Sequence, residues 1–142
     1  RFRSNPGFQM DLDLSSQGTV SESDIMISDW SGAAIEYALG LEKPVISVDV
    51  PRKVNNPGYR DISYEPIEVM LRSEIGDVIP IDRLPDIPAT VEQLCENPGI
   101  WQVRMRELRE RWIYNVGSSA EVMAAHIARA AEFESPHVEG NQ

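Results

Sequence analysis

The sequence predicts an α/β fold in which a parallel β-sheet is flanked by helices. Residues 25–27 and 45–46 are continuous apolar runs, which are typical of strands covered on both faces in a parallel sheet. A helical pattern lies between them, with short links on either side. Strand, helix and strand joined in this way form a βαβ unit, whose crossover is almost always right-handed. We therefore expect the ends of both strands at one edge of the sheet.

Periodicity and turn residues predict a strand and a helix in the N-terminal half. Residues 8–15 alternate apolar and polar side chains, which predicts a strand with one buried face. The helix between the two parallel strands is expected from Gly32 to Leu39, because its apolar residues share one stripe. Gly40 is the expected stop, since glycine readily adopts the left-handed conformation past a helix end.

The C-terminal half predicts one more strand and three helices. Residues 75–81 form a short apolar segment, which predicts a further buried strand. Residues 88–97 have the pattern of a helix with Cys95 near its apolar side. A long amphipathic helix is predicted over 100–116, and an Ala-rich helix capped at 118–119 follows.

Length and composition restrict the classes of protein. The 142 residues fit one compact domain, which we expect over 1–134, with a flexible tail at 135–142. A formal net charge of −10 argues against nucleic-acid binding, because neutralising phosphates requires clustered Lys and Arg. One cysteine and two histidines leave almost no parts for a zinc site or a histidine-dependent triad. We expect a piece of a longer protein, because the chain opens without Met or an apolar signal region.

The turn after the first parallel strand carries the candidate binding site. Ligands of open α/β sheets bind beyond the carboxyl ends of the strands, where a helix N-terminus offers free N–H groups to anions. Ser31, Gly32 and Ala33 occupy that position, and their small side chains let a phosphate approach the backbone. The alternative is that Ser31 is an ordinary N-cap, which is a common role of serine.

Three residues in or near this turn each have two possible roles. Glu36 lies five positions after Ser31, too far for a capping box, so it is either a solvated residue or a ligand of ribose hydroxyls. Asp29 either orients the turn or faces the ligand. Trp30 is either a lid over a base or a plug under the sheet.

The second parallel strand delivers a basic pair to the same edge. Arg52 and Lys53 would complement phosphate charge, Arg through a bidentate fork and Lys as a point charge. The alternative is a solvent-facing loop.

Residues 11–15, with Gly76 and Asp77 downstream, offer a competing motif. An Asp-x-Asp sequence followed by a hydroxyl resembles phosphatases that use an aspartate nucleophile and a bound magnesium ion. Alternation already explains Asp11 and Asp13 as outward residues of a strand, so we prefer the structural interpretation.

One stretch carries a family resemblance. Residues 23–32, Ser-Asp-Ile-Met-Ile-Ser-Asp-Trp-Ser-Gly, and residues 43–46, Lys-Pro-Val-Ile, resemble the recurring text of the CDP-glycerol glycerophosphotransferases, the teichoic-acid primases and polymerases. The match covers about thirty residues of their C-terminal nucleotide-binding lobe. It implies a Rossmann-like parallel sheet, the C-terminal lobe of a GT-B architecture, here truncated at its N-terminus.

The resemblance also implies an activity. The full-length protein would transfer a glycerophosphate unit from a CDP-linked donor to a hydroxyl of a polyol-phosphate or glycan acceptor in cell-envelope polymer biosynthesis. It would be cytoplasmic and peripheral to the inner face of the cell membrane, without a cofactor or a metal. The general-base histidine is expected upstream in the missing N-terminal lobe, so this chain by itself should bind the donor at best weakly and should not release CMP.

The resemblance assigns roles to individual residues. Ser31 and Gly32 would meet the diphosphate, although the family's usual second hydroxyl is absent at Gly32, and Glu36 or Asp29 would order the site. The complete predicted donor site comprises Asp29, Ser31, Gly32, Ala33, Glu36, Arg52 and Lys53.

Two other functions remain open at this point. A nucleotide-sugar glycosyltransferase lobe would use the same helix end for UDP or GDP, and a catalytically silent module would only dock on other chains. An exposed sheet edge would also permit self-association.

Overall fold

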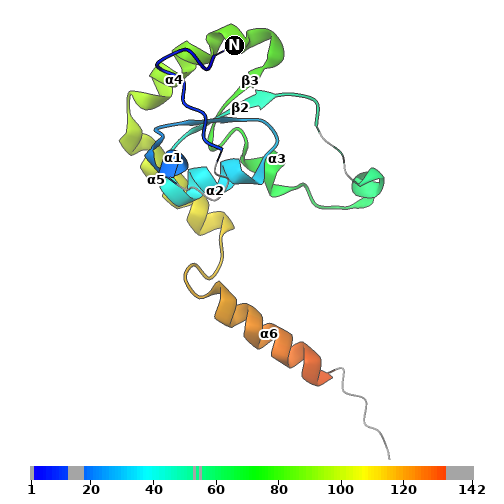
Figure 1. Ribbon diagram of the computed structural model, residues 1–142. Helices are drawn as coiled ribbons and strands as arrows, with labels where there is room; N and C mark the ends of the chain where they lie inside the picture. Colours follow the sequence, from blue (N-terminus) through cyan, green and yellow to red (C-terminus); the bar gives the residue numbers. More distant parts are fainter. Residues whose placement is uncertain (1, 13–17, 53, 55, 134–142) are drawn as a thin grey trace, which may run out of the picture. The chain divides into compact units, whose positions relative to one another are not determined.

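The computed structural model describes the chain at residues 2–12, 18–52, 54 and 56–133 (Figure 1). The chain divides into two compact units, Arg1–Glu107 and Leu108–Gln142. The predicted extent of a single domain over 1–134 stays a prediction.

The described residues form an α/β domain with a three-stranded parallel sheet and six α-helices. The strands lie in the order β1-β2-β3, and both neighbouring pairs are parallel. The predicted βαβ unit is confirmed, and so is the third strand. The elements are α1 (Gly18–Glu22), β1 (Met26–Ser28), α2 (Gly32–Leu41), β2 (Val45–Asp49), the 3-10 helix η1 (Pro57–Asp61), α3 (Ile67–Leu71), β3 (Gly76–Pro80), the 3-10 helix η2 (Ile81–Asp86), α4 (Ile87–Cys95), α5 (Pro98–Trp112) and α6 (Ser119–Phe133).

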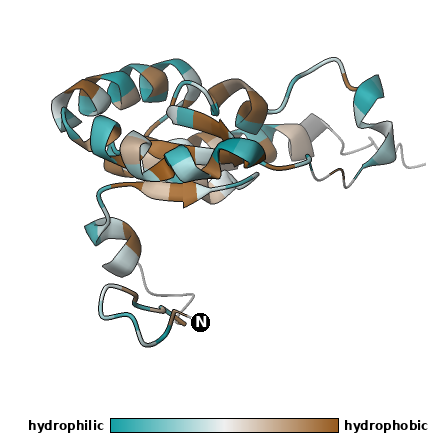
Figure 2. Ribbon diagram, turned by 90° about the horizontal axis from the view of Figure 1, so that it is seen from above, coloured by the Kyte–Doolittle hydropathy of each residue, from teal (hydrophilic) through white to brown (hydrophobic). Residues whose placement is uncertain are grey.

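Helices cover both faces of the sheet. Figure 1 shows α2 and α3 on one face and α4 on the other. Along β2 the side chains alternate between these layers: Ile46 packs with Ile79 and Leu94 on the α4 side, whereas Ser47 lies on the side of α2 and α3. Figure 2 shows hydrophobic strands next to helices of mixed hydropathy. The central strand is therefore buried on both faces, as its apolar run predicts.

Two strand predictions differ from the structure. Residues 8–12, the described part of the predicted strand at 8–15, have no regular secondary structure, and Leu12 is 79% exposed. Alternation in the sequence is not sufficient for a strand, because a strand also needs a neighbour to pair with. In β1, Ile27 is 49% exposed although both faces were expected to be covered. Within the described residues β1 pairs with β2 alone, so it is an edge strand.

The end of α2 also differs from the expectation. The helix continues through Gly40 to Leu41, and Glu42 adopts the left-handed conformation with φ 59°. A non-glycine residue rarely takes this conformation, which costs about 1 kcal/mol. The Glu42 carboxylate pairs with Arg106 of α5 at 2.8 Å.

The later helices form where the sequence predicts them, with two corrections. The predicted helix at 100–116 begins at Pro98 and ends at Trp112. Cys95, expected near an apolar side, is exposed at the last residue of α4. Among the helices of the described residues, none is both long enough and apolar enough to cross a membrane.

A buried tyrosine anchors α2 to the segment that leads into β1. Tyr37 is 2% exposed and its hydroxyl donates to the carbonyl oxygen of Ser23 at 2.9 Å. Lys43 donates to the same carbonyl oxygen at 2.7 Å. Burial raises the pKa of Tyr37 above 10.0, because the phenolate would be desolvated.

Replacing Tyr37 with Phe should lower the free energy of unfolding by about 1 kcal/mol, the typical value of one hydrogen bond. The folded chain holds the Tyr37 proton more tightly than the unfolded chain, so this stabilisation is complete below about pH 10 and is lost as the pH rises through the raised pKa. Urea unfolding at about pH 8 and about pH 11 should show a smaller pH dependence in Tyr37→Phe than in the parent. Tyr114→Phe, at a side chain that is 75% exposed, is the matched control. An unchanged pH dependence in Tyr37→Phe would contradict the assignment.

Candidate functional site

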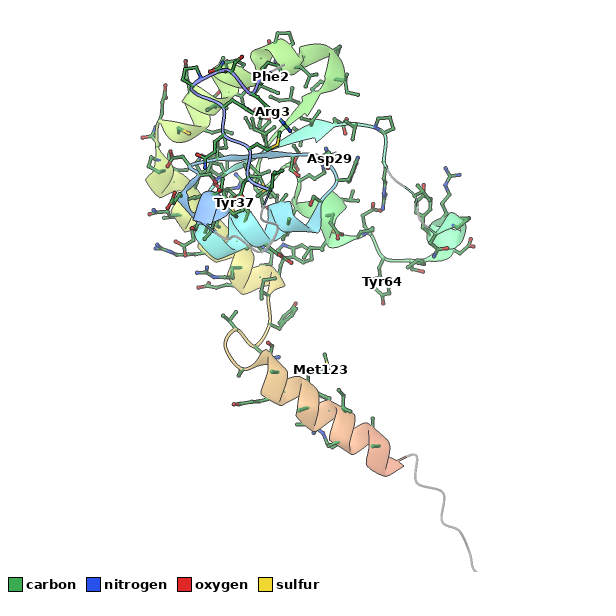
Figure 3. The ribbon with its side chains drawn as sticks, viewed as in Figure 1. Phe2, Arg3, Asp29, Tyr37, Tyr64 and Met123 are labelled. Carbon is green, nitrogen blue, oxygen red and sulfur yellow. The ribbon has the colours of Figure 1, made fainter. Side chains whose placement is uncertain are left out.

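The candidate site lies at the carboxyl edge of the sheet. The parallel register places Ser28 of β1 beside Ser47 of β2, so both strands end at the same edge of the sheet. Asp29 follows β1 there, and Figure 3 shows it on the side from which the loop after β2 leaves the sheet. The structure therefore brings the turn at 29–32 and the start of the loop at 50–66 to one edge, as the βαβ pattern predicts.

Ser31 occupies the N-cap position of α2. Its backbone is extended, with φ −142° and ψ 130°, and its carbonyl oxygen accepts the first bond, from the amide of Ala34, at 3.2 Å. Its hydroxyl makes no capping hydrogen bond. Ser31 is thus the N-cap residue by its position, but its side chain does not form the usual capping hydrogen bond. The first amides of the ten-residue α2 lack acceptors within the helix and lie at this edge, and Ser31 is partly buried.

The small residues after Ser31 leave the helix end open. Gly32 and Ala33 are both exposed, and a Cβ added at Gly32 would meet nothing within 4 Å. The space beside the Cα atom of Gly32 is therefore open, and both residues are accessible to solvent. The positive end of the helix dipole favours an anion by about 0.3–1 kcal/mol at an exposed site.

Glu36 lies one turn further along α2. Its side chain is exposed, and among the described residues it has no hydrogen-bond or ion-pair partner. Glu36 is also four residues after Gly32, so the two lie on the same side of the helix. A carboxylate in this place can accept hydrogen bonds from a ligand held at the helix N-terminus.

Trp30 connects the two strand ends. Its indole Nε1 donates to the carbonyl oxygen of Val50 at 2.8 Å, and its side chain is partly buried. The guanidinium carbon of Arg72 lies 3.9 Å from the centroid of the Trp30 ring, within the range of a cation–π contact. Of the two roles considered for Trp30, the structure therefore favours the plug that ties the turn to the sheet.

Arg72 is the residue of this site that the sequence did not reveal. It follows α3, and its side chain is only 11% exposed. One terminal nitrogen donates to the Asp49 carboxylate at 2.9 Å and the other to the carbonyl oxygen of Val48, also at 2.9 Å. Its Nε atom is buried without a hydrogen-bond partner. Arg72 thus joins α3, the end of β2 and the ring of Trp30.

A small cavity lies between Arg72 and the turn. Its volume is about 10 Å³, and its polar lining includes Asp29, Ser31, Ser47 and Glu68. This volume is close to the minimum that holds one water molecule. The underside of the turn, where Asp29 and Ser31 line this cavity, is therefore nearly filled.

Arg52 belongs to the loop after β2 and lies near the rings of Trp30 and Tyr59. Its guanidinium carbon lies 5.8 Å from the centroid of the Trp30 ring and 5.2 Å from that of Tyr59. The same side chain pairs with Glu65 at 3.3 Å. Arg52 is thus near the turn, its role in donor binding stays a prediction, and Lys53 lies outside the described residues.

The loop after β2 encloses a larger hollow, with a volume of about 360 Å³. Arg60 donates from Nε to the Tyr59 hydroxyl at 3.3 Å, and this hydrogen bond lowers the pKa of Tyr59 below its usual value. We call it the tyrosine–arginine hollow and define it by Arg52, Tyr59, Arg60, Ile62, Tyr64 and Glu65. In the sequence, the hollow is signalled by Tyr59, Arg60 and Tyr64, which follow one another closely.

The residues of the competing phosphatase motif lie elsewhere. Gly76 and Asp77 begin β3 and pair with the first residues of β2, so they lie at the opposite edge from Ser31. Asp11 is exposed and accepts a hydrogen bond from Thr19 at 2.7 Å, whereas Asp13 is outside the described residues. No group of His, Cys, Asp and Glu in the described part of the chain is arranged to hold a metal ion.

Comparisons of the chain with models of protein families, with curated proteins and with solved structures found no match. The geometry of the carboxyl edge and the resemblance of residues 23–32 and 43–46 are therefore the two grounds on which a function is proposed.

Proposed function

We propose that the chain is the donor-binding part of a transferase of GT-B architecture. The transferase moves a glycerophosphate unit from a CDP-linked donor to a hydroxyl of an acceptor polymer. The observation that carries the proposal is the uncapped hydroxyl of Ser31 at the open N-terminus of α2, on the carboxyl edge of a parallel sheet. This is where open α/β sheets bind their ligands.

The residues of the turn have separate tasks in this proposal. The diphosphate accepts hydrogen bonds from the amides of Gly32 and Ala33 and from the hydroxyl of Ser31. Arg52 lies beside Trp30, and its guanidinium places a positive charge next to the diphosphate. Glu36, exposed one turn into the helix, accepts hydrogen bonds from the ribose hydroxyls.

The fixed parts of the site explain why the turn is pre-formed. Trp30 is held by Val50 and Arg72 before any ligand binds, so little conformational entropy is lost when the diphosphate docks. The chemical step requires a general base within hydrogen-bond reach of the attacking hydroxyl. In this proposal a histidine of the N-terminal lobe supplies it, and the present chain supplies binding and orientation of the donor.

Replacing Ser31 with Ala should weaken the binding of CDP about tenfold, because one hydrogen bond to a charged phosphate is lost. The fold should not change, since the Ser31 hydroxyl makes no capping bond. Isothermal titration of CDP into parent and variant measures the effect. Ser4→Ala, the same chemical change at an exposed residue outside the turn, is the matched control. Equal affinities of the parent and Ser31→Ala would contradict the role of the hydroxyl.

The same titration with UDP and GDP tests the choice of nucleotide. A preference for UDP or GDP would replace the cytidine donor with a nucleotide-sugar donor. Binding of none of the three would leave the chain as a module without a nucleotide site and would overturn the proposal.

A further inference from the structure

The tyrosine–arginine hollow is a second place where charge and shape are suited to a ligand. It lies in the loop between β2 and α3, whose 3-10 helix η1 is fixed by its own hydrogen bonds. The Asn56 side chain accepts from the amide of Gly58 at 3.0 Å, and the amide of Ile62 donates to the carbonyl oxygen of Tyr59 at 3.2 Å. A volume of about 360 Å³ is within the range of small-molecule sites, about 300–1,000 Å³.

The hollow contains a guanidinium that is not neutralised. Arg52 pairs with Glu65 at 3.3 Å, but no carboxylate of the described residues lies within ion-pair distance of Arg60. Arg60 is instead held by the Tyr59 hydroxyl at 3.3 Å. The residues that line the hollow include two Arg and one Glu, so the lining itself has an excess of one positive charge. It therefore favours an anion.

The hollow offers donors that a phosphate can use. The Tyr59 hydroxyl accepts from Arg60, which leaves its own proton to donate to an anion oxygen. The terminal nitrogens of Arg60 remain available as a fork, which matches phosphate oxygens in a bidentate way. The cation lies 5.7 Å from the centroid of the Tyr59 ring, so the ring also restricts its position.

The rim of the hollow is apolar. Ile62 is 54% exposed and Tyr64 is 86% exposed, and Figure 3 shows Tyr64 on the loop that leads to α3. An anion with a small organic body would cover these side chains, whereas a bare inorganic ion would leave them in water. An organic phosphate fits both parts of the hollow.

Arg52 joins this hollow to the turn at the start of α2. Its guanidinium carbon is 5.2 Å from the Tyr59 ring on one side and 5.8 Å from the Trp30 ring. We propose that the tyrosine–arginine hollow binds an organic phosphate and that this phosphate belongs to the acceptor; the second part rests on the proposed function. A donor diphosphate on α2 and an acceptor phosphate in the hollow would then share Arg52.

The test is a titration of the ¹⁵N-labelled chain with sn-glycerol 3-phosphate, followed by amide NMR. Saturable shifts are expected at Gly58, Tyr59, Arg60 and Tyr64, and Arg60→Gln should weaken this binding about tenfold. Arg129→Gln, at an exposed residue of α6, is the matched control. The spectrum of Arg60→Gln without ligand shows whether the loop has kept its fold.

Three outcomes would overturn the proposal: equal shifts with uncharged glycerol, equal affinity of Arg60→Gln and the parent, or shifts confined to Gly32 and Ala33. A parallel titration with CDP separates the two phosphate sources. CDP is expected to shift Gly32 and Ala33 first, and Ser31→Ala should weaken CDP without affecting glycerol 3-phosphate. If CDP does not bind while glycerol 3-phosphate still occupies the hollow, the phosphate site stands and the donor-binding function fails.

Discussion

Gly76→Ala should destabilise the domain by about 4 kcal/mol or more, enough to prevent folding of a marginally stable unit. Gly76 begins β3 and lies opposite Val45 in the parallel register. A Cβ at this position would overlap the carbonyl oxygen of Val45 and lie 2.8 Å from its amide nitrogen, closer than side-chain carbons approach backbone. The Val45 amide donates to the carbonyl oxygen of Ile75 at 2.9 Å, so neither strand can move aside without breaking the ladder.

Urea unfolding followed by circular dichroism measures this effect, and Gly40→Ala is the matched control. Gly40 is exposed inside α2, and a Cβ there would meet nothing within 4 Å. Alanine should therefore raise the free energy of unfolding by about 0.5–1 kcal/mol at this position. A Gly76→Ala variant that unfolds within about 1 kcal/mol of the parent would contradict the close approach of β3 to β2.

Arg72→Met should lower the free energy of unfolding by about 2–4 kcal/mol, because it removes two charge-assisted hydrogen bonds and the cation–π contact with Trp30. The bond to Asp49 contributes the smaller part, since that carboxylate is 51% exposed. The bond to Val48 is partly buried, and the guanidinium carbon lies 3.9 Å from the Trp30 ring. Methionine keeps the length and apolar stem of the side chain, so the loss reflects the guanidinium.

Two further measurements distinguish a role in the turn from general packing. Arg72→Met should weaken CDP binding beyond its effect on stability, because Trp30 no longer holds the turn against Val50. Arg83→Met is the matched control: its ion pair with Asp86 is on the surface, and its loss should cost less than about 1 kcal/mol. Equal destabilisation by the two substitutions, or unchanged CDP affinity in folded Arg72→Met, would show that Arg72 does not support the turn.

The features that the sequence predicts correctly are those with local causes. The apolar run of β2 and the stripe of α2 follow from residues a few positions apart, and both elements form as expected. The turn at 29–32 is placed by the same logic, because the strand before it and the helix after it determine its edge. Local periodicity failed at 8–12, where alternating side chains have no neighbouring strand in the described structure.

The features that the sequence does not reveal depend on distant partners. Glu42 rather than Gly40 ends α2, and the Arg106 that pairs with Glu42 is 64 positions away. Arg72 bonds to residues 23 and 24 positions away, so no motif near it announces its role. The sequence leaves two roles open for Trp30 for the same reason, since its hydrogen-bond partner Val50 is 20 positions away.

The most direct test of donor binding is a titration of the ¹⁵N-labelled chain with CDP, followed at the amides of Gly32 and Ala33. The proposed site predicts saturable shifts at these two amides, because their N–H groups bind the diphosphate, and tighter binding of CDP than of UDP or GDP. The amides of β3, away from the turn, serve as internal controls. Unchanged resonances of Gly32 and Ala33 at CDP concentrations that saturate other parts of the chain would contradict a diphosphate site at the start of α2.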